Sequence, residues 1–383
     1  MTTRNLPFGK PWIGDEEKNA VLEVLSGDVL THGPQSKAFE EEFAEYMGGG
    51  YCVSVSSGMA ALHLSYLEMG IGAGDEVIVP AETHVATAHA VELVGARPVF
   101  LDCEPTTGNI DVSKLESLIT KKTKAISMVH FLGVPCEMDA IMKIADKYGL
   151  KVIEDCALAI GARYKGTHVG LIGDTGCYSF YPVKHITTGD GGMFVTKHKE
   201  VAARVMKIRG FYVDKTFAER TIPGMYDTLG LGLNYRMSDI NASIGRQQLR
   251  RMGVIREKRE ANFKALKSGL SNISGISILD SQNKDAVSSF YCLSVVLEKP
   301  LDAKRIEIVK KLNAAGIGTS VYYPQPVPRM SYYQNKYGYN AADFTGAERI
   351  SDQSIALPVG PHLTTDDMAY ISQTFSSILK ELN

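Results

Sequence analysis

Short β-rich segments alternate with amphipathic stretches between residues 51 and 196. The segments predicted to be strands are 51–55, 77–79, 98–101, 125–129, 151–153, 177–180 and 193–196. Most of them are separated by stretches such as 60–68, 84–94 and 138–148, which carry apolar residues three and four positions apart. Since parallel strands are joined by crossover helices, this alternation predicts an α/β domain whose mostly parallel seven-stranded sheet is flanked by helices.

The rest of the chain predicts two N-terminal helices and a second, smaller domain. Residues 15–25 and 35–46 have helical spacing, and Ser238 can cap a long helix that runs toward Arg251 and continues through residue 266. Beyond it, 276–279, 290–296 and 319–323 are predicted strands, and 303–315 and 365–382 are predicted helices. A chain of 383 residues exceeds one ordinary core, so we expect a large domain over 1–250 and a small α+β domain over 251–383.

The charge balance and the absence of metal motifs narrow the function classes. Lys plus Arg number 41 against 43 Asp plus Glu, which gives a net charge of −2 and argues against a nucleic-acid or anionic-membrane partner. The six cysteines form no CxxC pair and the nine histidines form no HExxH motif, so we predict reduced thiols and no metal. The N-terminal residues contain no apolar run, and no stretch could span a bilayer. We therefore expect a cytoplasmic protein.

Polar residues follow four of the predicted strands, where open parallel sheets place their ligands. They are Ser56-Ser57-Gly58-Met59, Glu82-Thr83-His84, Glu154-Asp155, and the run from Ser179 to Lys184 before a glycine-rich loop. Each has an ordinary structural alternative when taken alone: a plain helix start, a histidine with a packing role, a capping carboxylate or a solvated lysine. Small residues at a helix start can also bind an anion through backbone N–H groups.

Taken together, the four strand ends match the needs of pyridoxal 5′-phosphate. This cofactor requires an amine for a Schiff base, a carboxylate at its pyridine nitrogen, a phosphate cradle and a flat group against its ring. Lys184, Asp155, the turn at Gly58 and His84 supply these types. The charge-assisted bond from Asp155 to the pyridine would be worth about 1.5–3 kcal/mol. Lys184 must be partly desolvated, because a lower pKa leaves its amine neutral more often.

The chain also resembles the DegT family of sugar aminotransferases, which are fold type I pyridoxal-phosphate enzymes. The resemblance covers nearly the whole chain and rests on ordered motifs, which are Ser56-Ser57-Gly58, Gly74 to Pro80, Gly95 to Phe100, Ile153-Glu154-Asp155, Ser179-Phe180 with Lys184, Thr187-Thr188-Gly189, and Gly232 to Ser238. It implies a homodimer with shared active sites and an α/β fold with a smaller α+β C-terminal domain.

The resemblance also implies roles for individual residues. The phosphate would be held by the turn at Gly58 and Met59, by Ser179, and by Asn234 of the neighbouring subunit, while His84 would stack on the ring. Relatives that dehydrate sugars carry histidine at the lysine position, so Lys184 favours transamination. By family habit the donor would be L-glutamate and the acceptor a keto or aldehyde sugar, either a nucleotide-linked hexose or an 8-oxo-octulosonate used in lipopolysaccharide.

Three positions depart from the family pattern. Met59 stands where threonine is usual, which removes a hydroxyl contact to the phosphate, and Leu158 stands where glutamine would reach the phenolic oxygen of the cofactor. Asp190 replaces a common glutamate of the glycine-rich loop. The first two positions remain expected cofactor neighbours.

The sugar side of the site is less determined. The resemblance makes Arg236, Tyr322, Tyr323 and His185 candidate substrate residues, with packing or interface roles as the alternative. The basic run between residues 246 and 259 could approach a nucleotide diphosphate, but its interspersed glutamates favour a solvated helix face.

Two other interpretations stay open. A protein of this fold could bind the cofactor as a regulator or scaffold without turnover, although intact Lys184, Asp155 and Ser179 favour an enzyme. A nicotinamide oxidoreductase is the other α/β possibility, but no GxGxxG motif follows the first predicted strand.

Overall fold

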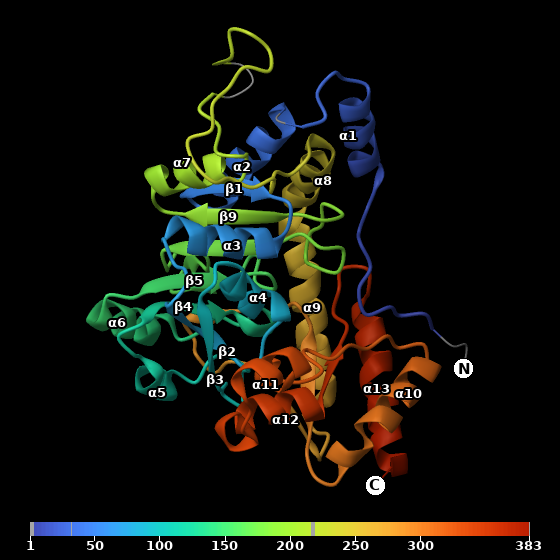
Figure 1. The fold of residues 1–383 in the computed structure, drawn as a ribbon. Coiled ribbons are helices and arrows are strands. Elements are labelled where there is room, and N and C mark those ends of the chain that lie inside the picture. Colours follow the sequence, from blue (N-terminus) through green and yellow to red (C-terminus); the bar gives the residue numbers. More distant parts are fainter. Residues whose placement is uncertain (1–3, 32, 216–218, 383) are drawn as a thin grey trace.

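A seven-stranded sheet forms the centre of the larger part of the molecule (Figure 1). The structure is a computed structural model that describes residues 4–31, 33–215 and 219–382. The strands are β1 (Tyr51–Val55), β2 (Glu76–Pro80), β3 (Arg97–Leu101), β4 (Thr123–Val129), β5 (Lys151–Asp155), β8 (Thr175–Ser179) and β9 (Gly192–Thr196). Their order is β1-β9-β8-β5-β4-β2-β3, and β9 pairs antiparallel with both of its neighbours. The seven predicted strands and the mostly parallel sheet are therefore confirmed.

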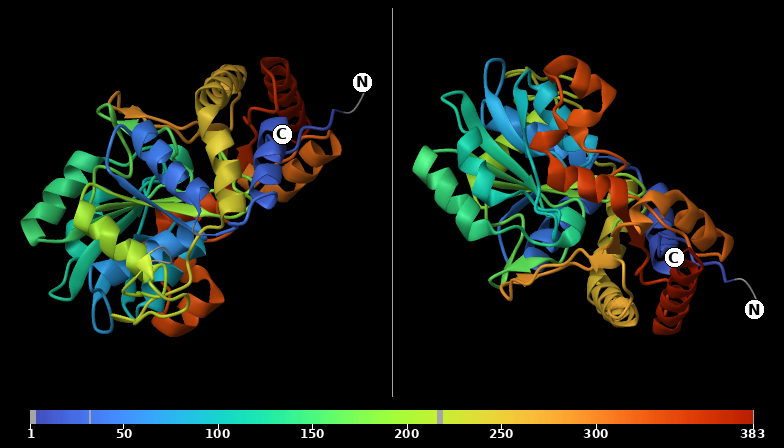
Figure 2. Two further views of the ribbon diagram at one scale, coloured as in Figure 1. Left: turned by 90° about the horizontal axis from the view of Figure 1, so that it is seen from above. Right: turned by 90° about the horizontal axis from the view of Figure 1, so that it is seen from below.

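Strand residues alternate between two buried faces, each covered by helices (Figure 2). Val53 and Val55 pack with α3 (Gly58–Glu68), α4 (Val85–Leu93) and α7 (Lys199–Ile208) on one face. Cys52 and the other face pack with helices α2 (Pro34–Met47), α8 (Asp239–Arg250) and, further along the sheet, α6 (Met138–Tyr148). Burial on both faces explains why these strands have nearly continuous apolar sequences.

The C-terminal part has its own antiparallel sheet and core. The long helix α9 (Met252–Leu270) leads into β10 (Ile276–Ile278), β12 (Leu293–Leu297) and β13 (Ser354–Leu357), which are covered by α10 (Arg305–Ala314) and α13 (Thr365–Leu382). The shorter elements are α1 (Asp15–Leu25), α5 (Val112–Leu115), α11 (Ser331–Tyr337), α12 (Thr345–Gln353), β6 (Arg163–Tyr164), β7 (Thr167–His168) and β11 (Ala286–Val287). Leu6, near the N-terminus, pairs with Ile317 and joins this second core.

Two predicted strands of the C-terminal part differ from the structure. The strand predicted over 319–323 is wrong: only Ser320 pairs, in an isolated bridge with Ala356, and β13 is the third strand instead. The ladder cannot continue because the N–H of Tyr323 donates to a Glu82 carboxylate oxygen. The strand predicted from residue 290 begins at Leu293, since Phe290 has a φ of 56° that turns the chain.

The helix predicted from Ser238 is divided into two. Ser238 caps α8 by accepting the N–H of Asn241 at 3.2 Å, as predicted. The helical path is interrupted at Arg251, and α9 carries it on into the C-terminal part. Most of the basic run meets carboxylates: Arg246 and Arg250 pair with Glu42 at 2.6 and 3.3 Å. Arg259 is buried and donates to the Tyr291 carbonyl at 2.8 Å, so the expected solvated helix face is only partly present.

One segment projects from the body of the molecule between α7 and α8 (Figure 1). We call it the arm, and its described residues are 210–215 and 219–235. Its two sides meet in the antiparallel bridges Gly210–Asn234 and Val213–Thr228. Leu231 is 89% exposed and Met225 is 63% exposed, so the arm presents apolar side chains to solvent in the single subunit.

Among the described residues, no helix is both long and apolar enough to cross a membrane.

Candidate active site

The structure gathers the four polar strand ends at one edge of the large sheet. Strands β1, β8, β5 and β2 run parallel to one another, so their carboxyl ends share that edge. The two predicted parts of the phosphate cradle touch: a Cβ on Gly58 would lie 2.9 Å from Ser179 Cβ and 3.3 Å from the Tyr178 carbonyl oxygen. Glycine is therefore required where α3 meets the end of β8.

The start of α3 has the form of an anion site. Ser57 is the N-cap, and its hydroxyl accepts the N–H of Ala60 at 3.1 Å. Gly58 and Met59 are the first two helical residues, so their N–H groups have no partner within the helix. These two N–H groups and the positive end of the helix can bind a phosphate. Ser179 is half-buried beside them.

The two carboxylates that end β5 have different surroundings. Glu154 is fully buried and accepts backbone N–H groups from Gly170, Ile172 and Gly173 at 2.6–2.8 Å, and His130 Nε2 lies 3.0 Å away. Its hydrogen-bonding capacity is used within the protein, which makes it a structural residue. The carboxylate left for a ligand is Asp155.

Asp155 is held in place by one side chain and one backbone group. Thr87 Oγ1 donates to its Oδ2 at 2.9 Å, and the N–H of Ala157 donates to its Oδ1 at 3.0 Å. Thr83 and Thr87 are joined by a hydrogen bond of 2.8 Å between their hydroxyls. Because the single proton of Thr87 is given to Asp155, Thr83 must be the donor in that bond. Asp155 is thus an acceptor in both bonds and can accept a further donor.

Lys184 is a desolvated amine near Asp155. It lies in a loop that is tied back to the end of β8, since the Phe180 carbonyl accepts the Thr187 hydroxyl and the Thr188 N–H at 2.9 and 3.0 Å. Its Nζ lies 5.8 Å from the centre of the Tyr291 ring. Burial lowers the pKa of Lys184 to about 8, and the negative charge of Asp155 acts in the opposite direction. The predicted desolvation of this lysine is therefore present.

His84 caps α4 and faces the same environment. Its Nδ1 accepts the N–H of Ala86 at 3.2 Å, so the proton of the neutral ring is on Nε2. Desolvation and the charge of Lys184 lower the pKa of His84, and the charge of Asp155 raises it. The Tyr323 ring meets the His84 ring edge to face at 5.7 Å. The charges of Lys184 and Asp155 both reach His84, so the three side chains lie near one another at this sheet edge.

Comparison with known proteins agrees with this geometry. Residues 11–376 match the DegT/DnrJ/EryC1/StrS aminotransferase family. The chain belongs to this family. The spore coat polysaccharide biosynthesis protein SpsC of Bacillus subtilis is 36% identical over 98% of this chain and 97% of its own.

Solved structures of other aminotransferases have the same fold. Spr1654 from Streptococcus pneumoniae, named as a sugar aminotransferase and solved in its PMP form, aligns over 99% of this chain and 100% of its own with a TM-score of 0.94 and 29% identity. PseC from Helicobacter pylori, an aminotransferase involved in the biosynthesis of pseudoaminic acid, aligns over 98% and 100% with a TM-score of 0.91 and 27% identity. The expected fold type I architecture is confirmed.

The protein is thus an enzyme of this aminotransferase family, and its cofactor is pyridoxal 5′-phosphate. The residues present fit that group. A half-buried amine with a lowered pKa, a fixed carboxylate, a helix start beside Ser179 and a flat ring lie at one sheet edge. Within the aminotransferase, Leu158 is buried beside Tyr322 and Tyr323, and its carbonyl accepts the Ser289 hydroxyl. Met59 packs on the core below the helix start.

The candidate substrate residues fall into three groups. Tyr322 and Tyr323 lie near the cofactor residues, and the Tyr322 hydroxyl is 2.7 Å from that of Tyr291. His185 is buried, and its Nε2 lies 3.0 Å from the Ser289 carbonyl oxygen, which is a packing arrangement. Arg236 lies at the base of the arm, with its guanidinium 4.9 Å from the Phe211 ring centre.

Asn234 is solvent-exposed at the base of the arm. The residue after it, Tyr235, accepts the Ser56 N–H at 2.8 Å through its carbonyl. The arm base of the aminotransferase is thereby attached to the strand end that leads into the phosphate turn.

Sequence reasoning missed Thr87 and Tyr291. Thr87 follows His84 by three residues, which places both on one side of the first turn of α4, so helical spacing could have suggested it. Tyr291 lies in the segment before β12, far along the chain from Lys184, and sequence spacing contains no signal of that contact.

One buried group has the composition of a metal site within the described part of the aminotransferase. It consists of His130, Glu154 and Cys156. The His130 Nδ1 accepts the Cys136 N–H at 3.1 Å, its Nε2 faces Glu154, and burial raises the pKa of the Cys156 thiol well above its usual value. Their atoms are thus engaged or protonated, and the absence of a metal stays a prediction.

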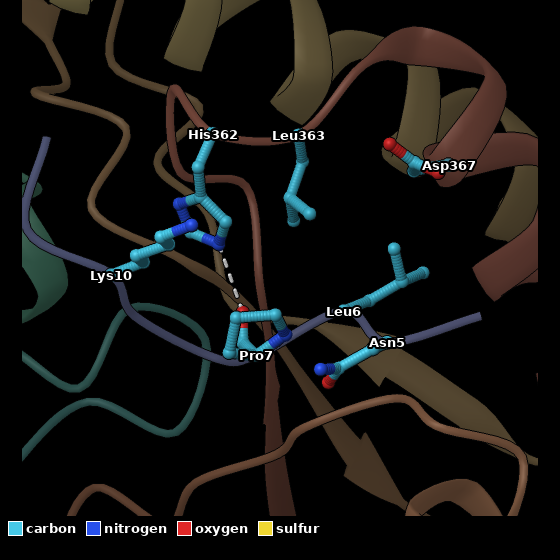
Figure 3. A pocket seen from close by; sticks show the side chains of 7 residues that line it. All are labelled: Asn5, Leu6, Pro7, Lys10, His362, Leu363 and Asp367. Carbon is cyan, nitrogen blue, oxygen red and sulfur yellow. Dashed lines mark hydrogen bonds between the residues drawn. The ribbon is translucent and has the colours of Figure 1, made fainter.

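A separate hollow lies between the N-terminal segment and the residues before α13 (Figure 3). It is lined by Asn5, Leu6, Pro7, Lys10, His362, Leu363 and Asp367. His362 Nε2 is 2.9 Å from the Pro7 carbonyl oxygen. None of the candidate cofactor or substrate residues lines this hollow.

Proposed function

We propose that the protein transfers an amino group from an amino acid, expected to be L-glutamate, to the keto or aldehyde group of a sugar used in cell-surface polysaccharide synthesis. The observation that carries this proposal is Lys184, a desolvated lysine that shares its surroundings with Asp155. The similarity to SpsC, a spore coat polysaccharide biosynthesis protein, supports a polysaccharide sugar. A nucleotide-linked hexose and an 8-oxo-octulosonate both satisfy it, and lipopolysaccharide is one destination.

The cofactor residues would act as follows. When bound, pyridoxal phosphate supplies an electron-accepting ring that stabilises negative charge at the substrate carbon. Lys184 would hold the cofactor through Nζ, and its amine would take up a proton from the bound amino acid and give it back. A pKa of about 8 lets its amine gain and lose that proton near neutral pH. Asp155, fixed by Thr87, keeps the pyridine nitrogen protonated.

Further residues would bind and orient the cofactor and the sugar. The N–H groups of Gly58 and Met59 and the Ser179 hydroxyl would hold the phosphate, and the His84 ring would supply the flat group against the cofactor ring. We place Tyr322 and Tyr323 beside the sugar because the Tyr323 ring contacts the His84 ring and the Tyr322 ring contacts that of Tyr323.

The arm supports the proposal of a homodimer with shared active sites. The arm exposes several large apolar side chains, among them Met225 at 63% and Leu231 at 89%, and a second copy of the chain could bury such a group. Asn234 at the arm base would then reach the phosphate of the neighbouring subunit, and Arg236 would lie at the same interface. We also propose a cytoplasmic location, because the six cysteines are free and buried.

The first experiment compares Lys184→Ala with Lys122→Ala, an exposed lysine that serves as the matched control. Both purified proteins are incubated with pyridoxal phosphate and examined by visible absorbance. The wild type and the control should be yellow, and Lys184→Ala should be folded yet lack the absorbance of covalently bound cofactor. Normal turnover by Lys184→Ala would show that the assignment is wrong.

A second experiment separates an enzyme from a cofactor-binding scaffold. Glutamate should bleach the yellow wild-type protein by converting the cofactor to its amine form. A panel of keto and aldehyde sugars is then added to the bleached protein, and the sugar that restores the absorbance identifies the acceptor. A protein that stays yellow with every amino acid would favour the scaffold interpretation.

A further inference from the structure

Glu82 is a buried carboxyl group that the proposed chemistry does not use. It lies in the connection between β2 and α4, two residues before His84, and it has no solvent exposure. A carboxyl group at such a position loses its hydration on folding, which an apolar side chain would not. Its burial is therefore tolerated only if its two oxygens find hydrogen-bonding partners.

Each oxygen of Glu82 accepts a hydrogen bond from the C-terminal part of the chain. The N–H of Tyr323 donates to Oε1 at 2.7 Å, and the Ser351 hydroxyl donates to Oε2 at 2.6 Å. Ser351 is itself fully buried in α12. The neighbouring Ala81 carbonyl accepts the Val327 N–H at 2.8 Å. These contacts join the loop that carries His84 to residues more than 240 positions later in the chain.

Glu82 is connected through its neighbours to the residues that are expected to hold the cofactor. Tyr323, which it holds through the backbone, presents its ring to His84 at 5.7 Å. The residue after Glu82 is Thr83, which begins the hydroxyl chain through Thr87 to Asp155. A movement of the Glu82 carboxyl group would therefore displace the Tyr323 ring and, through it, the expected stacking ring of His84.

Glu82 is suited to act as a neutral hydrogen-bonding group. Burial raises its pKa to about 8, Ser351 and the Tyr323 N–H lower it, Asp352 raises it and Arg329 lowers it. Burial and the negative charge of Glu82 both raise the pKa of the buried Cys103 thiol. When Glu82 is protonated, the bond to Ser351 reverses: the carboxylic acid donates to the Ser351 hydroxyl oxygen, and the other Glu82 oxygen still accepts from the Tyr323 N–H. A glutamine side chain offers the same donor and acceptor.

We propose that Glu82 is a positioning residue for the cofactor. By binding the Tyr323 N–H and the Ser351 hydroxyl, it joins the two parts of the chain and fixes the position of the Tyr323 ring against the His84 ring. This inference rests on the proposed function of His84 as the ring that covers the cofactor. The residue acts through His84 and Tyr323 and does not itself touch the reacting atoms.

The test measures the dissociation constant of pyridoxal phosphate for Glu82→Gln and Glu82→Met, at a temperature where circular dichroism shows every variant folded. Glu82→Gln keeps both hydrogen bonds and should stay within about 2-fold of the wild type. Glu82→Met has a similar length but no acceptor, and it should weaken binding about 10-fold, since 1.4 kcal/mol corresponds to a factor of ten. Ser351→Ala removes only one bond and should fall between them.

A double-mutant cycle separates positioning from simple loss of stability. In a His84→Ala background, Glu82→Met should cause little further loss of cofactor affinity, because the ring it positions is gone. Equal affinity of the wild type and Glu82→Met, or a full additional loss in the His84→Ala background, would overturn the inference. Failure of the wild type to bind pyridoxal phosphate would instead refute the proposed function.

Discussion

The lowered pKa of Lys184 gives a quantitative prediction. Its pKa is about 8 in the folded protein against 10.5 for an ordinary lysine. At pH 7.5 the neutral fraction would then be roughly one quarter, where an unperturbed lysine would have roughly one neutral amine in a thousand. At this pH, Lys184 of the apoenzyme should therefore react with electrophiles several hundred times faster than a lysine with a pKa of 10.5 would.

The assay is competitive labelling of the apoenzyme with trace acetic anhydride between pH 6 and 11. The extent of labelling of the Lys184 peptide is measured by mass spectrometry and normalised to its own plateau, with peptides of exposed lysines as internal references. Labelling of Lys184 should reach half of its plateau near pH 8. A labelling curve that keeps rising through pH 10 would refute the reasoning, because it would mean that the amine is not desolvated.

Asp155→Asn tests the link between the two residues. The charge of Asp155 raises the pKa of Lys184 against the effect of burial, so its removal should move the midpoint below 8. A midpoint that does not move would show that the two side chains face separate environments. His84 gives an internal check, because its pKa is lowered by Lys184 and raised by Asp155.

The same shift predicts how stability depends on pH. The unfolded chain binds a proton at Lys184 up to about pH 10.5 and the folded chain only up to about pH 8, so the free energy of unfolding rises between these values. Relative to Lys184→Met, the apoenzyme should be about 3 kcal/mol less stable below pH 8, and the difference should vanish by about pH 10.5. Urea unfolding of both proteins at pH 7 and pH 10 measures it.

Three further changes have expected outcomes. Thr87→Val removes the donor to Asp155 and should lower kcat about 10-fold with little change in fold, since a bond to a charged group is worth about 1.5–3 kcal/mol. An unchanged kcat would show that Asp155 does not need this hydrogen bond. Phe375→Ala empties a fully buried site in the C-terminal core and should reduce the free energy of unfolding by about 3–5 kcal/mol in urea titrations, and a loss below about 1 kcal/mol would contradict the packing. Leu231→Ser should weaken subunit association, with light scattering detecting monomers at concentrations where the wild type is dimeric; an unchanged mass would exclude the arm from the interface.

The large sheet could be predicted because its strands have a simple local signature. Each is a short buried run bounded by turn residues, and burial on both faces leaves little else that such runs could form. The segment 319–323 has the same composition but becomes an extended connection, because its Tyr323 N–H bonds Glu82 from the other part of the chain. Local propensity contains no information about that distant acceptor.

The candidate site was predictable as a set of residue types and less so as a set of contacts. Lys184, Asp155 and the Gly58 turn follow strands, and the topology of a parallel sheet brings such positions to one edge. The partners that give them their properties are distant in sequence: Thr87 lies 68 residues before Asp155, and Tyr291 lies far beyond Lys184. Desolvation of the lysine depends on these contacts, so only the folded chain determines its pKa.

The neighbouring carboxylates Glu154 and Asp155 have the same position in the sequence pattern, and only the structure distinguishes their surroundings. Both end the same strand, and alternation along β5 points them to opposite faces of the sheet. One face is closed by the loop that gives Glu154 three backbone N–H groups, and the other opens on Thr87 and Lys184. The two side chains therefore cannot exchange roles.

Two single substitutions test this assignment. The shortened side chain of Glu154→Asp could not reach all three N–H groups, and the lengthened side chain of Asp155→Glu would be displaced from Thr87. We expect the first change to lower stability and leave the cofactor spectrum unaltered, and the second to alter the spectrum and leave stability nearly unchanged. The opposite pattern, measured by urea unfolding and visible absorbance, would show that the two carboxylates have been assigned to the wrong faces.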